Sequence, residues 1–332
     1  MASNTEDNIR FKALVKELSG KRVVVLGHRR PDGDCIGSQV ALTRFLVVQG
    51  VHAEAFNSDP VPRKLQFLTR ETSVFTPDAL PKDWDAILCV DCSDVDRLGP
   101  DFKDKLTTAF ASFDHHVSNT HFAKHNFVRT DAAATAEILA DLFFDFGFEM
   151  DPVTAQALYV GLVTDTGQFQ YGTTTAHVFQ LAAKLVELGA CPGDASEELY
   201  ENTSFERMAL IQSFLQSLSL EFDGKVCIGT LPQGVFESTQ ASGEDVEGLV
   251  EYTRSLAGVE IGILLEELPN GELKGSLRSK RKEYRVDRLA GIFGGGGHVC
   301  ASGFRISGVI AEVYPRLIEA LRDHLAFVQS TL

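Results

Sequence analysis

Short apolar runs alternate with longer segments of helical periodicity through the first half of the chain. The short runs are rich in β-branched residues and predict strands, while the longer segments repeat apolar residues every three or four positions. This alternation is typical of a parallel sheet flanked by helices. We therefore predict an α/β domain with a five-stranded parallel sheet. Its predicted strands are residues 23–27, 52–56, 86–90, 108–113 and 126–129.

Helical periodicity fills the segments between these strands. Residues 36–49 carry apolar side chains at helical spacing, and Gly50 supplies a stop signal. Residues 1–22 have the mixed polar and apolar character of a short amphipathic helix. Three further helices, each followed by a glycine or begun by a proline, are predicted at residues 132–146, 152–163 and 176–188.

The second half of the chain has a mixed pattern. Three β-rich runs lie among helical stretches, and the sequence PNG at residues 269–271 predicts a hairpin turn between the last two runs. We predict a smaller α/β domain with a mixed sheet. Its predicted strands are residues 226–231, 260–268 and 272–279, and its predicted helices are residues 244–256, 286–292 and 309–325.

Length and a local change in composition divide the chain. A chain of 332 residues exceeds what one compact core usually holds, so two domains are favoured. The segment around Pro192 and Gly193 is polar and acidic, as linkers are. We predict a first domain at residues 1–190, a linker at residues 191–207 and a second domain at residues 208–332.

Composition also narrows the cellular setting. Residues 1–22 lack the apolar run of a signal peptide, and no stretch approaches the roughly 18 uncharged apolar residues that a membrane span needs. Six cysteines are scattered along the chain, which suits reduced thiols. We expect a cytoplasmic protein with no membrane partner and no disulfides. The oligomeric state is left open, with a homodimer as one option.

Net charge excludes one class of nucleic-acid-binding protein. A formal charge of −15 argues against a protein that coats long nucleic acid, because that binding mode requires a broad basic surface. A small polyanion is still an acceptable ligand, since bound cations would reverse the local field at an acidic site. We expect no long duplex nucleic acid as a partner.

The strongest local signal is the sequence GHRRPDGDCIGS at residues 27–38. It begins where a predicted strand ends and continues into a predicted helix, which is where open parallel sheets bind ligands. His28, Asp32 and Asp34 therefore offer one imidazole and two carboxylates within a tight turn. Cys35 lies beside them and could make the site sensitive to oxidation.

Acidic and imidazole side chains recur at the ends of later elements. Asp91 follows the third predicted strand, Asp114, His115 and His116 follow the fourth, and Asp165 lies just past a predicted helix. Because parallel strands end at the same edge of a sheet, these side chains should gather there. Clustered carboxylates would repel one another strongly unless cations neutralised them. The predicted metal ligands are His28, Asp32, Asp34, Asp91, His115 and Asp165.

The chemistry of this ligand set favours particular ions. Four carboxylates and two imidazoles suit a pair of ions such as Mn²⁺ or Mg²⁺ better than a structural zinc, which prefers sulfur. Cys89 and Cys92 have the C-x-x-C spacing of some zinc and redox sites, but the sequence has no second pair. Cys89 also falls in a predicted buried strand, so we interpret the pair as structural.

A glycine-rich loop carries the candidate chemistry of the second domain. Consecutive glycines expose backbone N–H groups that can wrap closely around a phosphate, and Arg278 on a nearby predicted strand could grip a phosphate bidentately. The loop and the histidine that follows it are Gly294, Gly295, Gly296, Gly297 and His298.

Five ordered motifs together resemble the DHH family of phosphoesterases. The family is named for the triplet that stands here as Asp114, His115 and His116. The resemblance spans nearly the whole chain and is closest to bacterial oligoribonucleases of the nanoRNase and pAp phosphatase type. The motifs are HRRPDGDCIGS, VDCSD, FDHHVSN, VTDTGQF and FGGGGHVCASG, the last being similar to the signature of the DHH-associated C-terminal domain.

The resemblance implies specific roles at the metal site. By the family pattern, His28 and Asp32 bind one divalent ion, and Asp34, His115 and Asp165 bind the other. Asp91 bridges both ions, and we count it as catalytic because it is the ligand that the two ions share. His116 would face the substrate phosphate, and Asp114 would support a histidine from behind. Mn²⁺ is the expected ion, with Mg²⁺ or Co²⁺ left open.

The resemblance also implies the substrate and reaction. Arg278, residues 294–297 and His298 would hold a terminal phosphate or nucleotide across a cleft between the domains. The expected reaction is hydrolysis of short oligoribonucleotides to mononucleotides, of 3'-phosphoadenosine 5'-phosphate (pAp) to AMP, or of both, by a hydroxide that two ions activate. Whether cleavage runs 3'–5' or 5'–3' is left open.

Several other functions fit the same scaffold. Within the family these are a phosphodiesterase of cyclic di-AMP or linear dinucleotides, a RecJ-like single-strand exonuclease and an inorganic pyrophosphatase. The acidic charge argues against the exonuclease, and the glycine loop argues against the pyrophosphatase. A nucleotide-binding regulator without catalysis is disfavoured because no ligand is missing. A transfer RNA editing module is suggested by the C-terminal domain alone.

Overall fold

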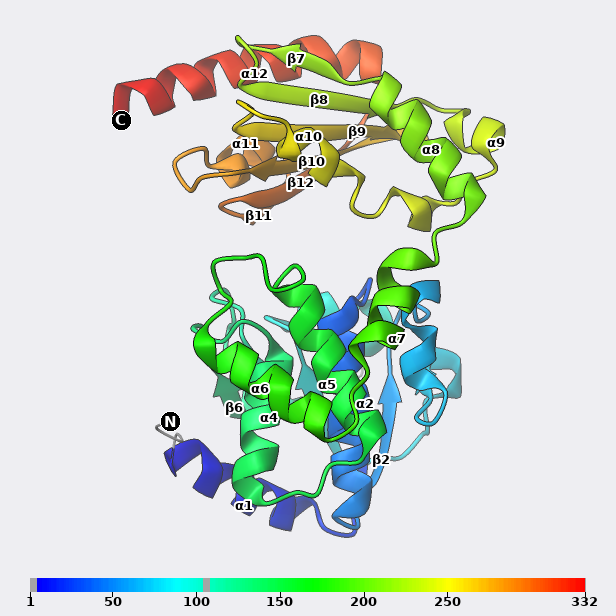
Figure 1. Cartoon of the computed structure of the whole chain (residues 1–332), viewed down its shortest axis with the longest axis vertical. Coiled ribbons are helices and arrows are strands. Elements are labelled where there is room, and N and C mark those ends of the chain that lie inside the picture. Colours follow the sequence, from blue (N-terminus) through cyan, green and yellow to red (C-terminus); the bar gives the residue numbers. More distant parts are fainter. Residues whose placement is uncertain (1–4, 104–107, 332) are drawn as a thin grey trace. The chain divides into compact units, whose positions relative to one another are not determined.

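The chain folds into two compact units (Figure 1). The computed structural model describes residues 5–103 and 108–331. The first unit is Met1–Asn202 and the second is Thr203–Leu332. Residues 191–207, which we predicted as a linker, hold helix α7 (Pro192–Ser196), a π-helical turn (Glu197–Glu201) and the first residues of helix α8 (Phe205–Gln216).

The first unit is an α/β fold built on a parallel sheet, as predicted. The sheet has six strands in the order β3-β2-β1-β4-β5-β6 rather than the predicted five, and every pairing is parallel. The additional strand, β3, has two residues, too few to give a periodic pattern. The strands are β1 (Arg22–Leu26), β2 (His52–Phe56), β3 (Val74–Phe75), β4 (Ala86–Val90), β5 (Ala109–Asp114) and β6 (Ala123–Val128).

The predicted helices of the first unit are present with shifted ends. Helix α2 begins at Gly33, three residues earlier than predicted, because the Asp32 side chain caps it by accepting the N–H of Cys35. Helix α5 extends to Asp165, which is its last residue rather than a loop residue. The helices are α1 (Thr5–Leu18), α2 (Gly33–Val48), the short α3 (Pro100–Lys103), α4 (Thr135–Phe146), α5 (Pro152–Asp165) and α6 (Ala176–Glu187).

Helices α2, α4 and α5 pack closely together (Figure 1). A Cβ atom added at Gly37 of α2 would lie 2.3 Å from the backbone oxygen of Ala157 in α5. A Cβ at Gly161 of α5 would lie 2.6 Å from Ala136 of α4 and 2.8 Å from the carboxylate of Asp34. The small residues at this crossing thus bring three helices to one carboxylate.

Aromatic packing joins helices α1, α2 and α4. Phe45 of α2 stacks on Phe143 of α4 with ring centroids 4.5 Å apart, and Phe11 of α1 lies 5.2 Å from Phe45. All three rings are buried. Such pairs contribute about 0.5–1.5 kcal/mol each beyond the area they bury.

The second unit contains a mixed sheet, also as predicted. Its order is β11-β12-β10-β9-β8-β7, with β8 and β9 parallel and the other pairs antiparallel. The PNG turn joins β9 to β10, and Gly271 adopts the left-handed φ of +78° that the turn needs. The strands are β7 (Ser219–Glu221), β8 (Val226–Leu231), β9 (Ile261–Glu267), β10 (Glu272–Ser279), β11 (Gly296–His298) and β12 (Ala301–Ser307).

Helices pack against this second sheet. The helix predicted at residues 244–256 is split at Gly248, whose φ is +80°, into a 3-10 turn and helix α10. Among the described residues, no helix combines the length and apolar character that crossing a membrane requires. The helices besides α8 are α9 (Val235–Thr239), α10 (Leu249–Ser255), α11 (Val286–Ile292) and α12 (Ile310–Thr331).

The close approach at Gly37 predicts a large cost for adding one carbon there. We expect Gly37→Ala to lower the free energy of unfolding by about 1–3 kcal/mol, because the new Cβ meets backbone that cannot rotate away. Urea unfolding in EDTA would measure this. Gly172→Ala is the matched control, since its Cβ meets nothing within 4 Å. Equal stability of the two variants would contradict the packing described.

Candidate metal centre

The loop between β1 and α2 supplies the first group of polar side chains. His28 is 3% exposed, and its Nδ1–H donates to the backbone oxygen of Arg29 at 2.8 Å. That hydrogen bond leaves Nε2 unprotonated in the neutral ring. Asp32 caps α2 and places Oδ2 3.7 Å from His28 Nε2. Asp34, in the first turn of α2, is fully buried.

The ends of β4 and β5 supply the second group. Asp91 follows β4 with a left-handed φ of +54°, and its N–H still donates to Phe113 of β5 at 2.9 Å. This turn directs a buried carboxylate toward the strand ends. Asp114 ends β5, and His115 and His116 come next.

Asp91 lies between the two groups. Its Oδ2 is 3.3 Å from Nε2 of His28. Its Oδ1 is 3.6 Å from Nε2 of His115 and 3.6 Å from Nδ1 of His116. One carboxylate oxygen therefore faces each side, which is the arrangement that a bridging ligand requires.

Helix α5 completes the cluster with its last residue. Asp165 Oδ2 lies 3.1 Å from Nε2 of His115. Ligand atoms of Asp34, His115 and Asp165 all lie within 4.8 Å of one another, a separation that one ion can span. The structure thus brings together the six residues predicted as ligands.

The surroundings of His28 Nε2 indicate whether this cluster fits a cation. Among the described residues, His28 Nε2 is buried without a hydrogen-bond partner, although Asp32 and Asp91 lie nearby. A buried polar atom without a partner is costly in a finished structure. A cation bound between this nitrogen and the two carboxylates would satisfy all three groups.

Protons occupy the place of cations in the metal-free cluster. Burial disfavours a charged His115, but the carboxylates of Asp165, Asp91 and Asp34 outweigh burial and raise its pKa to about 10. Burial and the charges of Asp32 and Asp91 raise the pKa of Asp165 to about 6, against the opposing effect of His115. The cluster therefore retains protons at neutral pH that a divalent ion would displace.

Asp114 contacts His116, the histidine next to the predicted ligand His115. Its Oδ1 lies 2.7 Å from Nδ1 of His116, and its Oδ2 accepts a hydrogen bond from Asn119 Nδ2 at 2.6 Å. Asp114 thus supports His116, whereas His115 Nδ1 faces the backbone oxygen of Ala132 at 3.4 Å. Our reasoning from sequence did not single out Asn119, although it lies within the FDHHVSN motif.

Three cysteines lie near the edge of the sheet, and one of them, Cys35, lies beside the cluster. Cys89 and Cys92 are buried, burial raises both of their pKa values, and Cys92 Sγ donates to the backbone oxygen of Asp94. Cys35 is buried beside the cluster, with Sγ within 4.8 Å of ligand atoms of His28 and Asp91.

In the second unit, the candidate phosphate-binding residues lie on neighbouring strands. Ala301 of β12 pairs with Arg278 of β10 on one side and with His298 of β11 on the other. Paired residues share a face, so Arg278 and His298 lie on one face about 10 Å apart, two strand spacings. Arg278 Nε donates to Glu251 at 3.0 Å, so its guanidinium is ion-paired.

The glycine loop is more ordered than a flexible turn. Gly296 and Gly297 pair with β12, and a Cβ at Gly295 would lie 2.2 Å from the backbone oxygen of Gly303. Gly294 and Gly297 have φ values of +73° and +142°. These glycines permit a tight approach of backbone to backbone that side chains would block.

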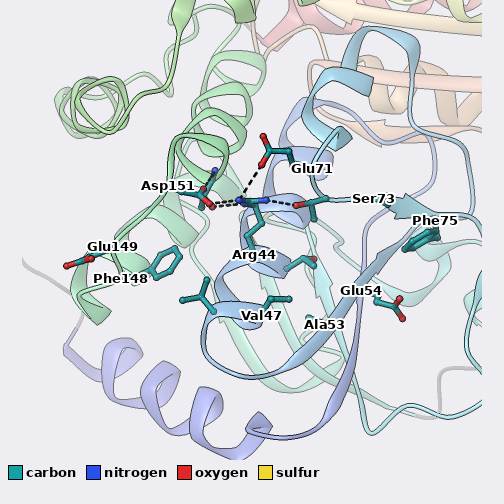
Figure 2. Close-up of a pocket in the computed structure, with 14 residues that line it drawn as sticks. Arg44, Val47, Ala53, Glu54, Glu71, Ser73, Phe75, Phe148, Glu149 and Asp151 are labelled. Carbon is teal, nitrogen blue, oxygen red and sulfur yellow. Dashed lines mark hydrogen bonds and ion pairs between the residues drawn. The ribbon is translucent and has the colours of Figure 1, made fainter.

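A pocket in the first unit involves none of the predicted site residues (Figure 2). Its volume is about 380 Å³, with Val47, Phe75 and Phe148 among its apolar walls. Figure 2 shows Arg44 beside Asp151 and Glu71, with which it forms ion pairs. Side-chain chemistry, rather than cavity size, identifies the candidate metal centre.

Comparison with known proteins identifies two domains in the chain. The model of the DHH family, N-terminal domain, matches residues 22–162, and the model of the DHHA1 domain matches residues 223–326. The chain therefore contains a DHH domain followed by a DHHA1 domain. The resemblance read from the sequence is thereby confirmed, and the chain is a hydrolase that acts on phosphoester bonds.

Relatives align over almost the full length of the chain. A protein of Thermus thermophilus named bifunctional oligoribonuclease and PAP phosphatase NrnA is 29% identical over 321 residues, covering 96% of this chain and 95% of the relative. The NrnA of Bacillus subtilis is 24% identical, covering 88% of this chain and 92% of the relative.

Solved structures share the fold. An exopolyphosphatase-related protein from Bacteroides fragilis superposes with a TM-score of 0.90 at 24% identity, covering 98% of each chain. Exonuclease RecJ bound to manganese superposes with a TM-score of 0.52 at 16% identity, covering 97% of this chain and 94% of that one.

The protonated state of the cluster predicts pH-dependent metal binding. Since His115 keeps its proton up to about pH 10, a cation must displace that proton, and affinity for Mn²⁺ should rise with pH up to that value. Below about pH 6 Asp165 also takes up a proton, so affinity should fall more steeply there. Calorimetry in buffers of different ionisation enthalpy would measure the protons released. Affinity that does not change with pH would contradict these protonation states.

Proposed function

We propose that the chain hydrolyses short oligoribonucleotides to mononucleotides, pAp to AMP, or both, using two divalent ions held by the six clustered residues. The observation that carries the proposal is the position of Asp91, with one oxygen facing His28 and the other facing His115. The names of relatives that align along nearly the whole chain support the choice of substrates.

The ligand assignment follows the two sides of the cluster. His28 and Asp32 would hold one ion with Oδ2 of Asp91. Asp34, His115 and Asp165 would hold the other with Oδ1 of Asp91. Oxygen and imidazole ligands suit Mn²⁺, which we propose as the working ion, with Mg²⁺ or Co²⁺ as alternatives.

The chain's own groups would complete the reaction. When bound, two such ions would supply an activated hydroxide and neutralise charge on the phosphate. The bond to Asp114 fixes the ring of His116 through Nδ1. The ring of His116 would face a phosphoryl oxygen and stabilise the charge that develops there.

The second unit would provide recognition of the substrate. The face of β10, β12 and β11 that carries Arg278 and His298 offers two cationic or hydrogen-bonding groups with the small Ala301 between them. Beside them, the N–H groups of Gly294 and Gly295 already donate to the backbone oxygens of Gly291 and Ala290, so a phosphate would be contacted by backbone N–H groups of Gly296 and Gly297. We propose that Arg278, residues 294–297 and His298 bind the terminal phosphate or nucleotide.

Product analysis would decide among substrates. The purified chain with Mn²⁺ would be incubated with a ladder of short RNAs, pAp, cyclic di-AMP, pyrophosphate and polyphosphate. The proposal expects mononucleotides from the short RNAs, AMP from pAp, or both. Hydrolysis confined to cyclic di-AMP or to the inorganic substrates would contradict it.

The bridging position predicts that Asp91 is indispensable. We expect Asp91→Ala to lower kcat by about 10³-fold or more, because the two bound metal ions would supply several kcal/mol of transition-state stabilisation. Circular dichroism should show a folded protein. Asp96→Ala is the control, since Asp96 is an exposed acid in the 3-10 helix Val95–Leu98 that follows Asp91 in the chain. A fully active Asp91→Ala variant would refute the assignment.

A separate prediction tests the second unit. We expect Arg278→Gln to raise KM for pAp by roughly 10-fold or more, the effect of losing one charge-assisted hydrogen bond. Arg254→Gln is the matched control, because Arg254 also pairs with Glu251 but has no proposed contact with substrate. If both variants raise KM equally, the effect belongs to Glu251 and the proposed role of Arg278 is wrong.

A further inference from the structure

Thr135 contacts two carboxylates of the cluster at once. It is the first residue of α4 and is fully buried. Its Oγ1 hydroxyl donates to Oδ1 of Asp91 at 3.2 Å, and its backbone N–H donates to Oδ2 of Asp34 at 2.6 Å. One residue thus joins a carboxylate at the end of β4 to a carboxylate of α2.

The start of α4 is held by groups from outside the helix. Its N-cap residue, Ala134, has no side chain that could cap it. Instead, Asp34 accepts the N–H groups of Thr135 and of Ala136, the latter at 2.9 Å, and Glu137 accepts the N–H of Ala133 at 2.7 Å. The helix therefore cannot shift without losing hydrogen bonds that satisfy its first turn.

The Thr135 hydroxyl restricts rotation of the Asp91 carboxylate. Pairing with Phe113 fixes the backbone of Asp91, so rotation of the carboxylate is what can still vary. The hydroxyl of Thr135 donates a hydrogen bond to Oδ1 of Asp91, the oxygen on the side of His115 and His116. The other oxygen, Oδ2, faces His28. The hydroxyl thus sets which oxygen faces which side of the cluster.

This contact is separable from the stability of the helix. The backbone N–H groups that Asp34 accepts do not depend on the side chain at residue 135. Valine has the same branched shape as threonine but carries a methyl in place of the hydroxyl. Thr135→Val therefore removes the bond to Asp91 and keeps those to Asp34.

We propose that Thr135 is a positioning residue that orients Asp91 relative to Asp34, so that both metal positions form together. The proposal rests on the two-ion function proposed above and extends it to a residue outside the ligand set. Groups that orient metal ligands in this way typically change metal affinity or activity by 10–100-fold when they are removed.

The test compares Mn²⁺ binding by full-length variants. Calorimetry gives the dissociation constants, and electron paramagnetic resonance reports whether two Mn²⁺ ions are close enough to couple magnetically. We expect Thr135→Val to weaken at least one Mn²⁺ site by about 10–100-fold and to reduce the coupled signal. Thr135→Ser, which keeps the hydroxyl, should bind Mn²⁺ as the unmodified chain does.

Thr43→Val provides a matched control. Thr43 is also a buried threonine, it lies on the helix that carries Asp34, and its hydroxyl has no hydrogen-bond partner among the described residues. This variant should leave Mn²⁺ binding unchanged. Equal weakening by Thr43→Val and Thr135→Val would show a general packing effect and overturn the proposal.

The remaining outcomes separate this proposal from the function on which it rests. If the unmodified chain binds no pair of Mn²⁺ ions, the proposed function fails. If it binds the pair and Thr135→Val binds it equally well, the positioning role alone is overturned. Failure of Thr135→Ser to restore binding, or of Thr135→Val to fold in EDTA, would also overturn it, since the residue would then serve the fold.

Discussion

Mutual repulsion among buried carboxylates is the constraint on which the site depends. Asp34 and Asp91 are almost fully buried, and Asp32 and Asp165 lie close to them. Two like charges about 4 Å apart repel by roughly 4 kcal/mol at the effective dielectric of a protein surface, and more in the interior. The metal-free chain relieves this repulsion by protonation, whereas divalent ions would relieve it and supply chemistry at the same place.

The fold holds these groups together despite their repulsion. Parallel strands bring Asp91 and His115 to one edge of the sheet, and the crossing of α2 and α5 at Gly37 and Gly161 brings Asp34 and Asp165 beside them. Backbone N–H groups at the start of α4 donate to Asp34, although burial and the charges of Asp91 and Asp165 raise the pKa of its carboxyl well above the usual value. Packing of the helices and pairing of the strands thus offset the repulsion among the clustered carboxylates.

The residues of the candidate site could be singled out from the sequence because they follow elements with strong periodic patterns. His28 and Asp91 each follow a recognisable buried strand. Because parallel strands end at the same edge of a sheet, the two side chains are expected to lie close together. The two-residue strand β3 and the glycine strand β11 carry no such pattern and could not be predicted. The hydrogen bonds of Thr135 could not be predicted either, because its partners, Asp91 and Asp34, are 44 and 101 residues away in the chain.

The most direct test is a crystal structure of the chain grown with Mn²⁺, using anomalous scattering to locate the ions. The account predicts two manganese peaks, one beside His28 and Asp32 and one among Asp34, His115 and Asp165, with Asp91 between them. Peaks elsewhere, or an empty cluster in crystals that still hydrolyse substrate, would contradict it.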